Sequence, residues 1–376
     1  MRLSSRRRFA LALAVCAVAA IIATRAAAGN AAPGIASRLS ISQLAGQRVI
    51  YAYAGLTPPP SLLARIRAGE AAGVIFFASN FSSPAQLRAT VSQLQRANAA
   101  GPVHAPLLML IDQEGGLVNR LPGAPVQSER AIGASSHGQT LAAQAGSEAA
   151  ANLTAAGITV DLAPVLDVYR RPGNFIDQYQ RSYSMNPATV ARLGRAFITH
   201  LQAAGVAATA KHFPGLGAAS TAENTDATPV ELRLPLSELR STDEQPYRAA
   251  IAAGVKLVMV SWAVYPALDP RMPAGLSPRV IGQELRTRLR FSGVTITDSI
   301  GAGALARFGG YGERAILAAR AGEDLILCAT TNPDENTPNE GIDVLGGLTR
   351  ALSTHGLSRP AAEQAAARVI RLRAGL

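Results

Sequence analysis

The chain has 376 residues, 48% of them hydrophobic and 16% charged, which is ample apolar material for a buried core. Its formal net charge is +11 at pH 7, and the arginines of residues 1–28, where no acid occurs, contribute 5 of these charges and leave +6. The remaining positive charges are scattered and aromatic residues make up only 5%, which argues against a nucleic-acid-binding protein. Scattered positive charge suits a protein near an anionic cell envelope, although surplus surface arginine explains it equally well.

Residues 1–28 are predicted to be an export signal. Arginines precede an apolar run of 16 residues, Phe9 to Thr24, and such a run is short for a membrane-spanning helix of about 20 residues. Ala26–Ala28 offers a cleavage site, and Ser5–Phe9 resembles the twin-arginine signal. We expect cleavage, export to the cell envelope or the extracellular space, and no stable membrane insertion afterwards. An uncleaved N-terminal anchor is the alternative.

The two cysteines exclude a disulfide framework. Cys16 lies in the predicted signal, which leaves Cys328 alone at the end of an apolar run. We expect Cys328 to be a small buried apolar side chain. A zinc site cannot be built from one cysteine, and we expect neither a metal nor a cofactor.

Residues 29–42 form a polar lead-in, after which short apolar runs alternate with helical patterns. The apolar runs, each predicted to be a strand, are Arg48–Ala54, Val74–Phe77, Leu107–Ile111, Val160–Leu162, Ala207–Ala210, Leu257–Val260, Val294–Thr297 and Leu325–Leu327. The helices predicted between them include Ser61–Ala71, Pro84–Ala99, Thr140–Ala156, Pro187–Ala204, Ser237–Ala253, Pro278–Leu289 and Gly312–Ala321.

Continuously apolar strands that alternate with helices indicate a parallel sheet buried on both faces. Eight such units predict an α/β protein with a single-domain (β/α)8 barrel over residues 43–376, and an open doubly wound sheet is the alternative. No G-x-G-x-x-G motif follows the first strand, so a nucleotide-binding crevice has no support. The last segment, Pro360–Leu376, reads as a basic amphipathic helix, which we expect on the outside of the barrel with its arginines in solvent.

Polar residues gather directly after the predicted strands. Asp112 follows the third run, Asp167 the fourth, Lys211 and His212 the fifth, and Asp298 the seventh. Any one of these is open to interpretation as a helix cap or a turn residue. In a barrel, however, catalytic residues lie at the carboxyl ends of the strands, and four such places together predict an active site there.

These places also carry a family resemblance. Lys211–Gly217, with the sequence KHFPGLG, resembles the signature of bacterial family 3 glycoside hydrolases, in particular the single-domain β-N-acetylglucosaminidases of cell-wall recycling. The resemblance covers about residues 42–372 and includes, in family order, Leu110–Gly116, Asp161–Val168, Ile176 with Arg181–Ser184 and Asn186–Pro187, and Val294–Ser299.

The resemblance implies a retaining glycosidase that works without metal or cofactor, through a covalent intermediate on Asp298. A structural alternative for Asp298 is a cap for a helix near residues 301–305. The implied substrate is a terminal β-linked N-acetylglucosamine on a peptidoglycan fragment, and we expect a monomer. The residues implied to hold the sugar are Asp112, Arg120, Arg181, Lys211 and His212, whose side chains suit hydroxyl and carbonyl groups.

The sequence departs from the family pattern at three places. Leu117 stands where the family often has Arg, and Trp262 stands where many members have His; a core or rim position is the commoner role for such a Trp. The acid/base motif Asp-(Ser/Thr)-His of the resembled branch is not matched, and with two extra residues in the loop Asn224-Thr225-Asp226 aligns with it instead. None of the histidines outside the predicted signal lies in this loop; they are His104, His137, His200, His212 and His355.

Three explanations for the missing histidine stay open. Asp226 or Glu223 supplies the proton as a carboxylic acid with a raised pKa, as glycosidase acids usually do. Alternatively, the protein binds glycans without cleaving them, or the acid comes from elsewhere in the chain or is replaced by a reactive leaving group. A carboxylate of the loop Ala218–Ala227 that points into the mouth of the barrel near Asp298 would favour the enzyme.

Overall fold

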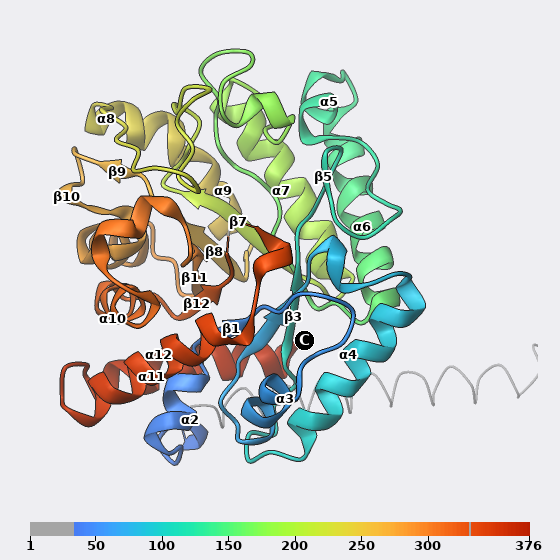
Figure 1. Ribbon diagram of the computed structural model, residues 1–376. Coiled ribbons are helices and arrows are strands. Elements are labelled where there is room, and N and C mark those ends of the chain that lie inside the picture. Colours follow the sequence, from blue (N-terminus) through green and yellow to red (C-terminus); the bar gives the residue numbers. More distant parts are fainter. Residues whose placement is uncertain (1–33, 331) are drawn as a thin grey trace, which may run out of the picture.

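A closed parallel barrel dominates the computed structural model, which describes residues 34–330 and 332–376 (Figure 1). In order around the barrel the strands are β1 (Val49–Tyr51), β12 (Leu325–Cys328), β11 (Val294–Ser299), β8 (Leu257–Val260), β7 (Ala207–Phe213), β6 (Val160–Asp161), β3 (Leu108–Ile111) and β2 (Gly73–Ile75). Each predicted apolar run overlaps one of these strands, and the pairing of β12 with β1 closes the sheet. The predicted (β/α)8 barrel is therefore confirmed. The expected export signal lies outside the described residues.

The two buried faces of the strands explain their continuous apolar sequence. On β1, Ile50 packs with Leu108 and Leu257 in the barrel interior, whereas Val49 and Tyr51 belong to the outer apolar layer beneath the helices. All of these side chains are buried. A strand in this position gains from an apolar residue at every place, so alternation is lost.

The outer layer consists of helices, and several of them begin at a capping side chain. The helices are α2 (Ile41–Gly46), α3 (Pro60–Arg67), α4 (Pro84–Ala99), α5 (Glu129–Ala134), α6 (Gly138–Ala156), α7 (Pro187–Ala203), the π-helix η5 (Arg279–Arg288), α10 (Tyr311–Ala321) and α11 (Pro338–Ser353). Ser83 and Asn186 accept hydrogen bonds from the first turns of α4 and α7. Gly157 ends α6 in the left-handed conformation, as a glycine after the last turn predicts.

The predicted helix Ser237–Ala253 is wrong as a continuous element. The structure divides it into α8 (Leu236–Glu238), the π-helical turn η3 (Leu239–Asp243) and α9 (Gln245–Ala252). Pro246 lies in the first turn of α9. Because proline has no N–H to donate to the preceding turn, it is tolerated where a helix starts and not in the middle of one.

Short elements follow the carboxyl ends of the strands and surround the mouth of the barrel. Two are small antiparallel sheets, which the sequence analysis does not predict, and the others are 3-10 helices. They are the sheet of β4 (Gln113–Gly115) and β5 (Val118–Asn119), the sheet of β9 (Val264–Tyr265) and β10 (Asp269–Pro273), η1 (Ala78–Asn80), η2 (Asp177–Tyr179), η4 (Ala274–Leu276), η6 (Gly303–Phe308) and η7 (Pro333–Glu335).

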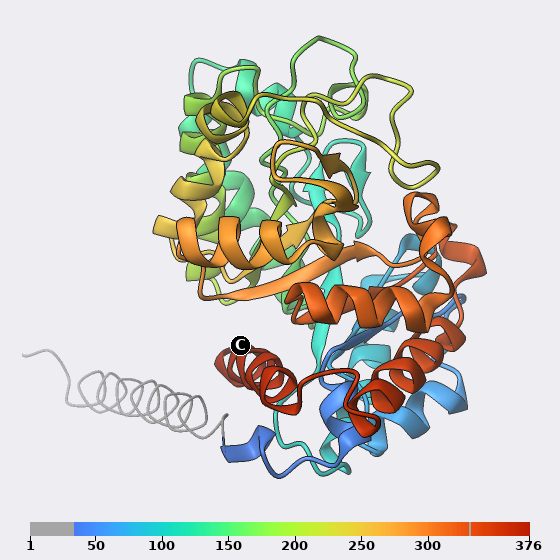
Figure 2. The same cartoon turned by 90° about the vertical axis from the view of Figure 1, so that its left-hand side faces the viewer.

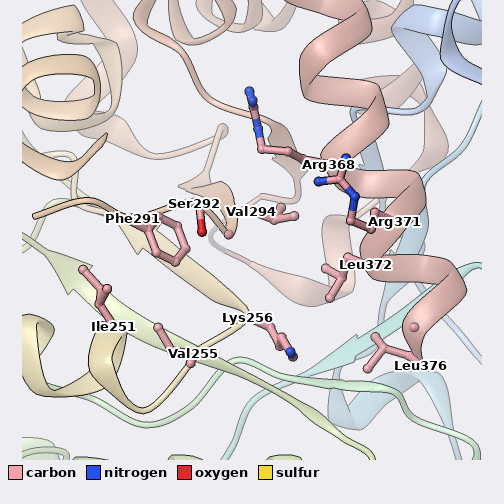
Figure 3. Close-up of a pocket in the computed structure, with 13 residues that line it drawn as sticks. Ile251, Val255, Lys256, Phe291, Ser292, Val294, Arg368, Arg371, Leu372 and Leu376 are labelled. Atoms are coloured by element: carbon pink, nitrogen blue, oxygen red, sulfur yellow. The ribbon is translucent and has the colours of Figure 1, made fainter. Parts of the chain in front are cut away.

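The last helix, α12 (Arg359–Gly375), closes the opposite end of the barrel (Figure 2, red helix at the mark C). Val369 packs into the same interior cluster as the strand residues, and Leu372 packs against that cluster. A cavity of about 400 Å³ lies beside it. Figure 3 shows Lys256 on the barrel side of this cavity and Arg368 and Arg371 on α12. The helix is therefore part of the core of the barrel and not only an outer cover.

The arginines of α12 do not all lie in solvent as expected. The side chain of Arg373 is only 1% exposed, and it donates to the carbonyl oxygens of Ala105 (2.6 Å) and Pro106 (2.7 Å) and to Asn98 Oδ1 (3.2 Å). Burial lowers the pKa of Arg373 to about 9. A guanidinium has five N–H donors. The sequence pattern predicts that these donors bind water, but in the structure backbone carbonyl oxygens accept their hydrogen bonds instead.

The first described residues contact the start of α12. Arg359, at the start of α12, donates to the carbonyl oxygens of Ser37 (3.3 Å) and Leu39 (3.2 Å) in the predicted lead-in, where Ala36 and Leu39 are buried.

Within residues 34–330 and 332–376, no helix combines the length and the apolar character that crossing a membrane requires.

Candidate active site

A cavity of about 480 Å³ lies at the carboxyl ends of the strands. Its floor consists of apolar side chains from the barrel interior, namely Ile75, Leu162, Met259 and Leu327. Its polar wall brings together the predicted nucleophile, the predicted acid and the predicted sugar-binding residues, which are Asp298, Asp226, Asp112, Arg120, Arg181, Lys211 and His212. Residues from five separate loops and strand ends thus meet in one place, as the barrel topology predicts.

Strand β7 is longer than predicted and includes Lys211 and His212. The predicted strand ends at Ala210, but β7 continues to Phe213, so Lys211 and His212 lie on the strand and not in the loop after it. Phe213 pairs with Val260 of β8. Backbone pairing with a neighbouring strand fixes both side chains more firmly than a loop would.

Lys211 is buried between two carboxylates. Its side chain is 2% exposed, and Nζ lies 2.6 Å from Asp112 Oδ1 and 2.6 Å from Glu114 Oε1. Burial alone would lower the pKa of Lys211, but the charges of Asp112 and Glu114 outweigh it and raise the pKa. The ammonium group is therefore held in its charged form, with donors fixed at the floor of the cavity.

Glu114 contacts both buried cations of the site, although it is not among the predicted site residues and only lies within the motif Leu110–Gly116. It accepts two hydrogen bonds of 2.9 Å from Nε and a terminal nitrogen of Arg181, in addition to its contact with Lys211. Burial would raise the pKa of Glu114, but the charges of Arg181 and Lys211 and their hydrogen bonds lower it to about 2. One buried carboxylate thus neutralises and orients two cations.

Replacement of Glu114 by Gln is expected to lower the free energy of unfolding at pH 7 by about 3–5 kcal/mol, the usual cost of breaking a buried ion pair. The pKa of Glu114 is lowered in the folded state. Its contribution is therefore fully present above about pH 4.5 and is lost as the pH falls toward 2. Urea unfolding at pH 7 and pH 3 measures both effects. Glu148→Gln, at an exposed contact with Gln144, serves as the control, and equal stability of the two variants at pH 7 would contradict the assignment.

Asp167 orients the imidazole of His212. Asp167 Oδ2 lies 2.8 Å from His212 Nδ1, while Oδ1 accepts from the backbone N–H groups of His212 (3.3 Å) and Leu216 (2.7 Å). Because an ionised carboxylate only accepts, Nδ1 carries the hydrogen. His212 Nε2 then lies 3.4 Å from an Arg181 nitrogen, which only donates. In this arrangement Nδ1 of His212 is engaged by Asp167 and Nε2 faces a donor, so that Nε2 has no proton to give to a substrate.

Asp298 lies on the extended end of β11, one residue beyond the predicted strand. Its Oδ1 accepts from the backbone N–H of Ser299 (2.7 Å), and the carbonyl oxygen of Ser299 accepts from Trp262 Nε1 (2.8 Å). Trp262 is 1% exposed. It is therefore a core residue that fixes the backbone beside Asp298, and the core position expected for it is confirmed.

Asp226 brings a second carboxylate to the cavity from the loop after β7. Its side chain is open to solvent, yet it lines the cavity. Surrounding protein atoms, followed by the charge of Asp298, raise the pKa of Asp226 to about 6. Glu223, the other candidate acid, is not among the cavity-lining residues, and its Oε2 accepts from the backbone N–H of Ser220 (2.7 Å). Of the two carboxylates, Asp226 is thus the one that lines the cavity together with Asp298.

Arg120 and an apolar rim complete the cavity. Among the described residues, the buried Nε of Arg120 has no hydrogen-bond acceptor, which leaves it as a donor for a ligand. At the rim, Leu117 is 62% and Tyr179 is 45% exposed. Tyr179 is supported by an edge contact with Phe175, with ring centroids 6.1 Å apart. Exposed apolar side chains beside a polar cavity are suited to contact the apolar face of a bound ligand.

The remaining sequence expectations fall outside this cavity. Cys328 is buried and free, as expected. Of the candidate histidines, only His212 lines the cavity. Within the described part of the chain, no group of three or more His, Cys, Asp and Glu side chains is arranged to hold a metal ion.

Comparison with known proteins gives consistent matches. The sequence model of the glycosyl hydrolase family 3 N-terminal domain matches residues 43–372. An uncharacterised secreted glycosyl hydrolase of Arthroderma benhamiae is 45% identical over 351 residues, which are 93% of this chain and 97% of the relative. A β-hexosaminidase of Xanthomonas oryzae pv. oryzae is 38% identical over 272 residues, 68% of this chain and 75% of the relative.

Solved structures show the same relationship. A glycoside hydrolase family 3 β-N-acetylglucosaminidase from Paenibacillus sp. str. FPU-7 superimposes with a TM-score of 0.83 at 34% identity, covering 89% of this chain and 63% of that chain. The β-N-acetylhexosaminidase from Beutenbergia cavernae superimposes with a TM-score of 0.79 at 31% identity, covering 90% and 99% of the two chains. The chain thus spans less than two thirds of the Paenibacillus protein but nearly all of the Beutenbergia one.

Proposed function

Because the chain belongs to glycosyl hydrolase family 3 and is a glycoside hydrolase, we propose that it removes terminal β-linked N-acetylglucosamine from glycans with retention of configuration. The observation that carries this proposal is the pair of carboxylates, Asp298 and Asp226, that line one cavity. A retaining glycosidase needs one carboxylate as nucleophile and one carboxylic acid as proton donor. The pKa of about 6 for Asp226 suits the second task.

The first half of the reaction forms a covalent intermediate. The Asp298 carboxylate attacks the anomeric carbon, and the bond between this carbon and the leaving oxygen breaks. Asp226 gives its proton to the leaving oxygen, so that a neutral alcohol departs. The backbone N–H of Ser299 holds one oxygen of Asp298 at 2.7 Å and fixes the direction of the carboxylate.

The second half releases the sugar. Asp226, now ionised, takes a proton from a water molecule, whose oxygen attacks the anomeric carbon from the face that the leaving group vacated. The ester bond to Asp298 breaks, and both carboxyl groups return to their starting states. Two inversions at the same carbon give net retention.

The sugar is held by the polar wall of the cavity. Asp112 accepts from hydroxyl groups, while Arg120, Arg181 and Lys211 donate to hydroxyl or carbonyl oxygens. The ion pairs of Lys211 with Asp112 and Glu114 fix these donors before the substrate arrives. Such preorganisation reduces the cost of ordering side chains on binding.

The setting of the reaction is part of the proposal. The export signal predicted over residues 1–28 and the secreted relative of Arthroderma benhamiae support an exported enzyme. The relatives named as β-hexosaminidases and β-N-acetylglucosaminidases support an N-acetylglucosaminide as substrate. We assign it to the ends of peptidoglycan fragments, which exported hydrolases meet at the cell envelope.

A trapping experiment tests the proposal. The purified protein is incubated with a fluorinated N-acetylglucosaminide that carries an activated leaving group, and is then weighed intact and mapped by peptide mass spectrometry. We expect a covalent sugar on Asp298, and none in an Asp298→Asn variant. No adduct, with sugar binding still detectable by calorimetry, would favour a glycan-binding protein on the same barrel. If neither an adduct nor sugar binding is observed, the proposed substrate is wrong.

A further inference from the structure

The loop that carries Asp226 lies directly on the segment that follows Asp298. The backbone N–H of Gly303, the first residue of η6, donates to the carbonyl oxygen of Asp226 at 2.7 Å, and the N–H of Ala304 donates to that of Thr225 at 3.1 Å. Gly303 follows Asp298 by only five positions in the sequence. The segments that carry the two carboxylates are therefore joined backbone to backbone.

Gly303 is the residue that permits this contact. A Cβ atom added at this position would lie 2.1 Å from the carbonyl oxygen and 2.6 Å from the carbonyl carbon of Ala227, and 3.0 Å from the carbonyl oxygen of Asp226. Real Cβ atoms do not approach backbone atoms at such distances, and a backbone cannot turn aside as a flexible side chain can. Any side chain at position 303 must therefore move the loop away from η6.

Further hydrogen bonds restrict how the loop that carries Asp226 can move in response to a side chain at position 303. Asn224 Oδ1 accepts from the backbone N–H of Asp226 (2.9 Å) and so holds the turn on its cavity side. On the other side, Asn174 Nδ2 donates to the carbonyl oxygen of Gly217 (2.8 Å), and Thr221 Oγ1 donates to that of Gly173 (2.8 Å). The loop is anchored at its start, so a displacement at Gly303 is concentrated around Asp226.

We propose that Gly303 is a positioning residue for the general acid: its lack of a side chain lets η6 hold the backbone of Asp226 against the segment that carries Asp298. This inference rests on the proposed role of Asp226 as the acid. A proton donor must lie within hydrogen-bond reach of the leaving oxygen, and a misplacement of about 1 Å costs on the order of 10²-fold in rate. The effect is specific, because protonation matters only when the leaving group is a poor one.

The test is the Gly303→Ala variant, assayed by kcat/KM on two substrates with the same N-acetylglucosamine unit. One is the disaccharide chitobiose, whose leaving group needs a proton, and the other is the dinitrophenyl glycoside, whose leaving group does not. We expect kcat/KM for the disaccharide to fall at least about tenfold, within the range that general acid catalysis supplies, and kcat/KM for the aryl glycoside to change less than about threefold. The ratio of the two values is the readout that a general loss of folded protein does not move.

Two further variants keep the test decisive. Gly347→Ala is the matched control, because its Cβ would lie 2.7 Å from Gly312 Cα in the packing of helices outside the cavity. We expect it to lower stability and leave the substrate ratio unchanged. Asn224→Ala leaves Gly303 intact and removes the other hold on the Asp226 turn, so it should shift the ratio in the same direction even if Gly303→Ala fails to fold.

The outcomes separate the inference from the function on which it rests. A normal ratio in the folded Gly303→Ala variant, or the same altered ratio in Gly347→Ala, overturns the positioning role. If Asp226→Asn itself leaves the ratio unchanged, the proposed acid is wrong and the inference falls with it. If Asp226→Asn changes the ratio and Gly303→Ala does not, only the positioning role is lost.

Discussion

Replacement of Asp298 by Asn is expected to lower kcat/KM by about 10⁴-fold or more, as removal of other covalent nucleophiles does. The amide has nearly the same shape as the carboxylate, and its oxygen can still accept the hydrogen bond from the N–H of Ser299. Only the negative charge and the nucleophilic oxygen are lost. Because both kinds of leaving group require the covalent step, chitobiose and the dinitrophenyl glycoside should be affected alike. Initial rates on the two substrates measure the effect.

The control for this prediction is Asp334→Asn. Asp334 is an exposed carboxylate in η7, on the loop after the neighbouring strand, and it does not line the cavity. Its replacement should leave the rate within a factor of about two, as a surface substitution does. If the Asp298 variant kept most of the activity and the trapped sugar mapped to a different carboxylate, the nucleophile would have to be reassigned.

Replacement of Asp226 by Asn is expected to lower kcat/KM for chitobiose by about 10²–10⁴-fold, the range that general acid catalysis supplies. The dinitrophenyl glycoside should change only a few-fold in kcat/KM, because its leaving group departs without a proton. Azide needs no general base to attack the proposed covalent intermediate on Asp298. Added azide should therefore restore the turnover of the Asp226→Asn variant and give a glycosyl azide as the product. Equal losses on both substrates would contradict the assignment of Asp226 as acid and base.

The pH profile gives a second measurement of the same role. The pKa of Asp226 is raised to about 6, so its carboxyl group keeps its proton up to that pH and loses it above. For chitobiose, kcat/KM of the unmodified enzyme should therefore fall as the pH rises through about 6, and this fall should be absent in Asp226→Asn. Glu223→Gln is the matched control and should keep the fall, because the Glu223 carboxylate is bound to Ser220 and lies outside the cavity.

The strands of the barrel were predictable because burial on both faces requires a continuous run of apolar residues, which is visible in the sequence. Their ends were not, because polar residues that serve the site extend β7 through Lys211 and His212 and extend β11 through Asp298. Hydrophobicity cannot detect a strand whose last residues are charged, since only the pairing with the next strand makes them regular. The predicted β7 therefore stops three residues, and the predicted β11 two residues, before the end of the observed strand.

The contacts between side chains of the site were harder to predict than the identity of the residues that line it. Lys211 and Arg181 meet at Glu114, which is 97 and 67 positions away in the sequence, and no local spacing records that meeting. The motif around Asp112 contained Glu114, so a search for a carboxylate to balance two buried cations would have found it. Arg373 was misread for the same reason, because its acceptors belong to segments more than 250 residues earlier.

The closure of the barrel by α12 has a consequence for biosynthesis. The interior cluster contains Ile50 of the first strand and Val369 of the last helix, so it spans almost the whole described chain. A nascent chain cannot seal this apolar interior until its final segment has been made. Contacts of such long sequence separation form slowly, and the partly made barrel meanwhile exposes apolar surface that favours aggregation. Truncation within α12 should therefore reduce the yield of soluble protein although the cavity that contains Asp226 and Asp298 lies at the other end of the barrel.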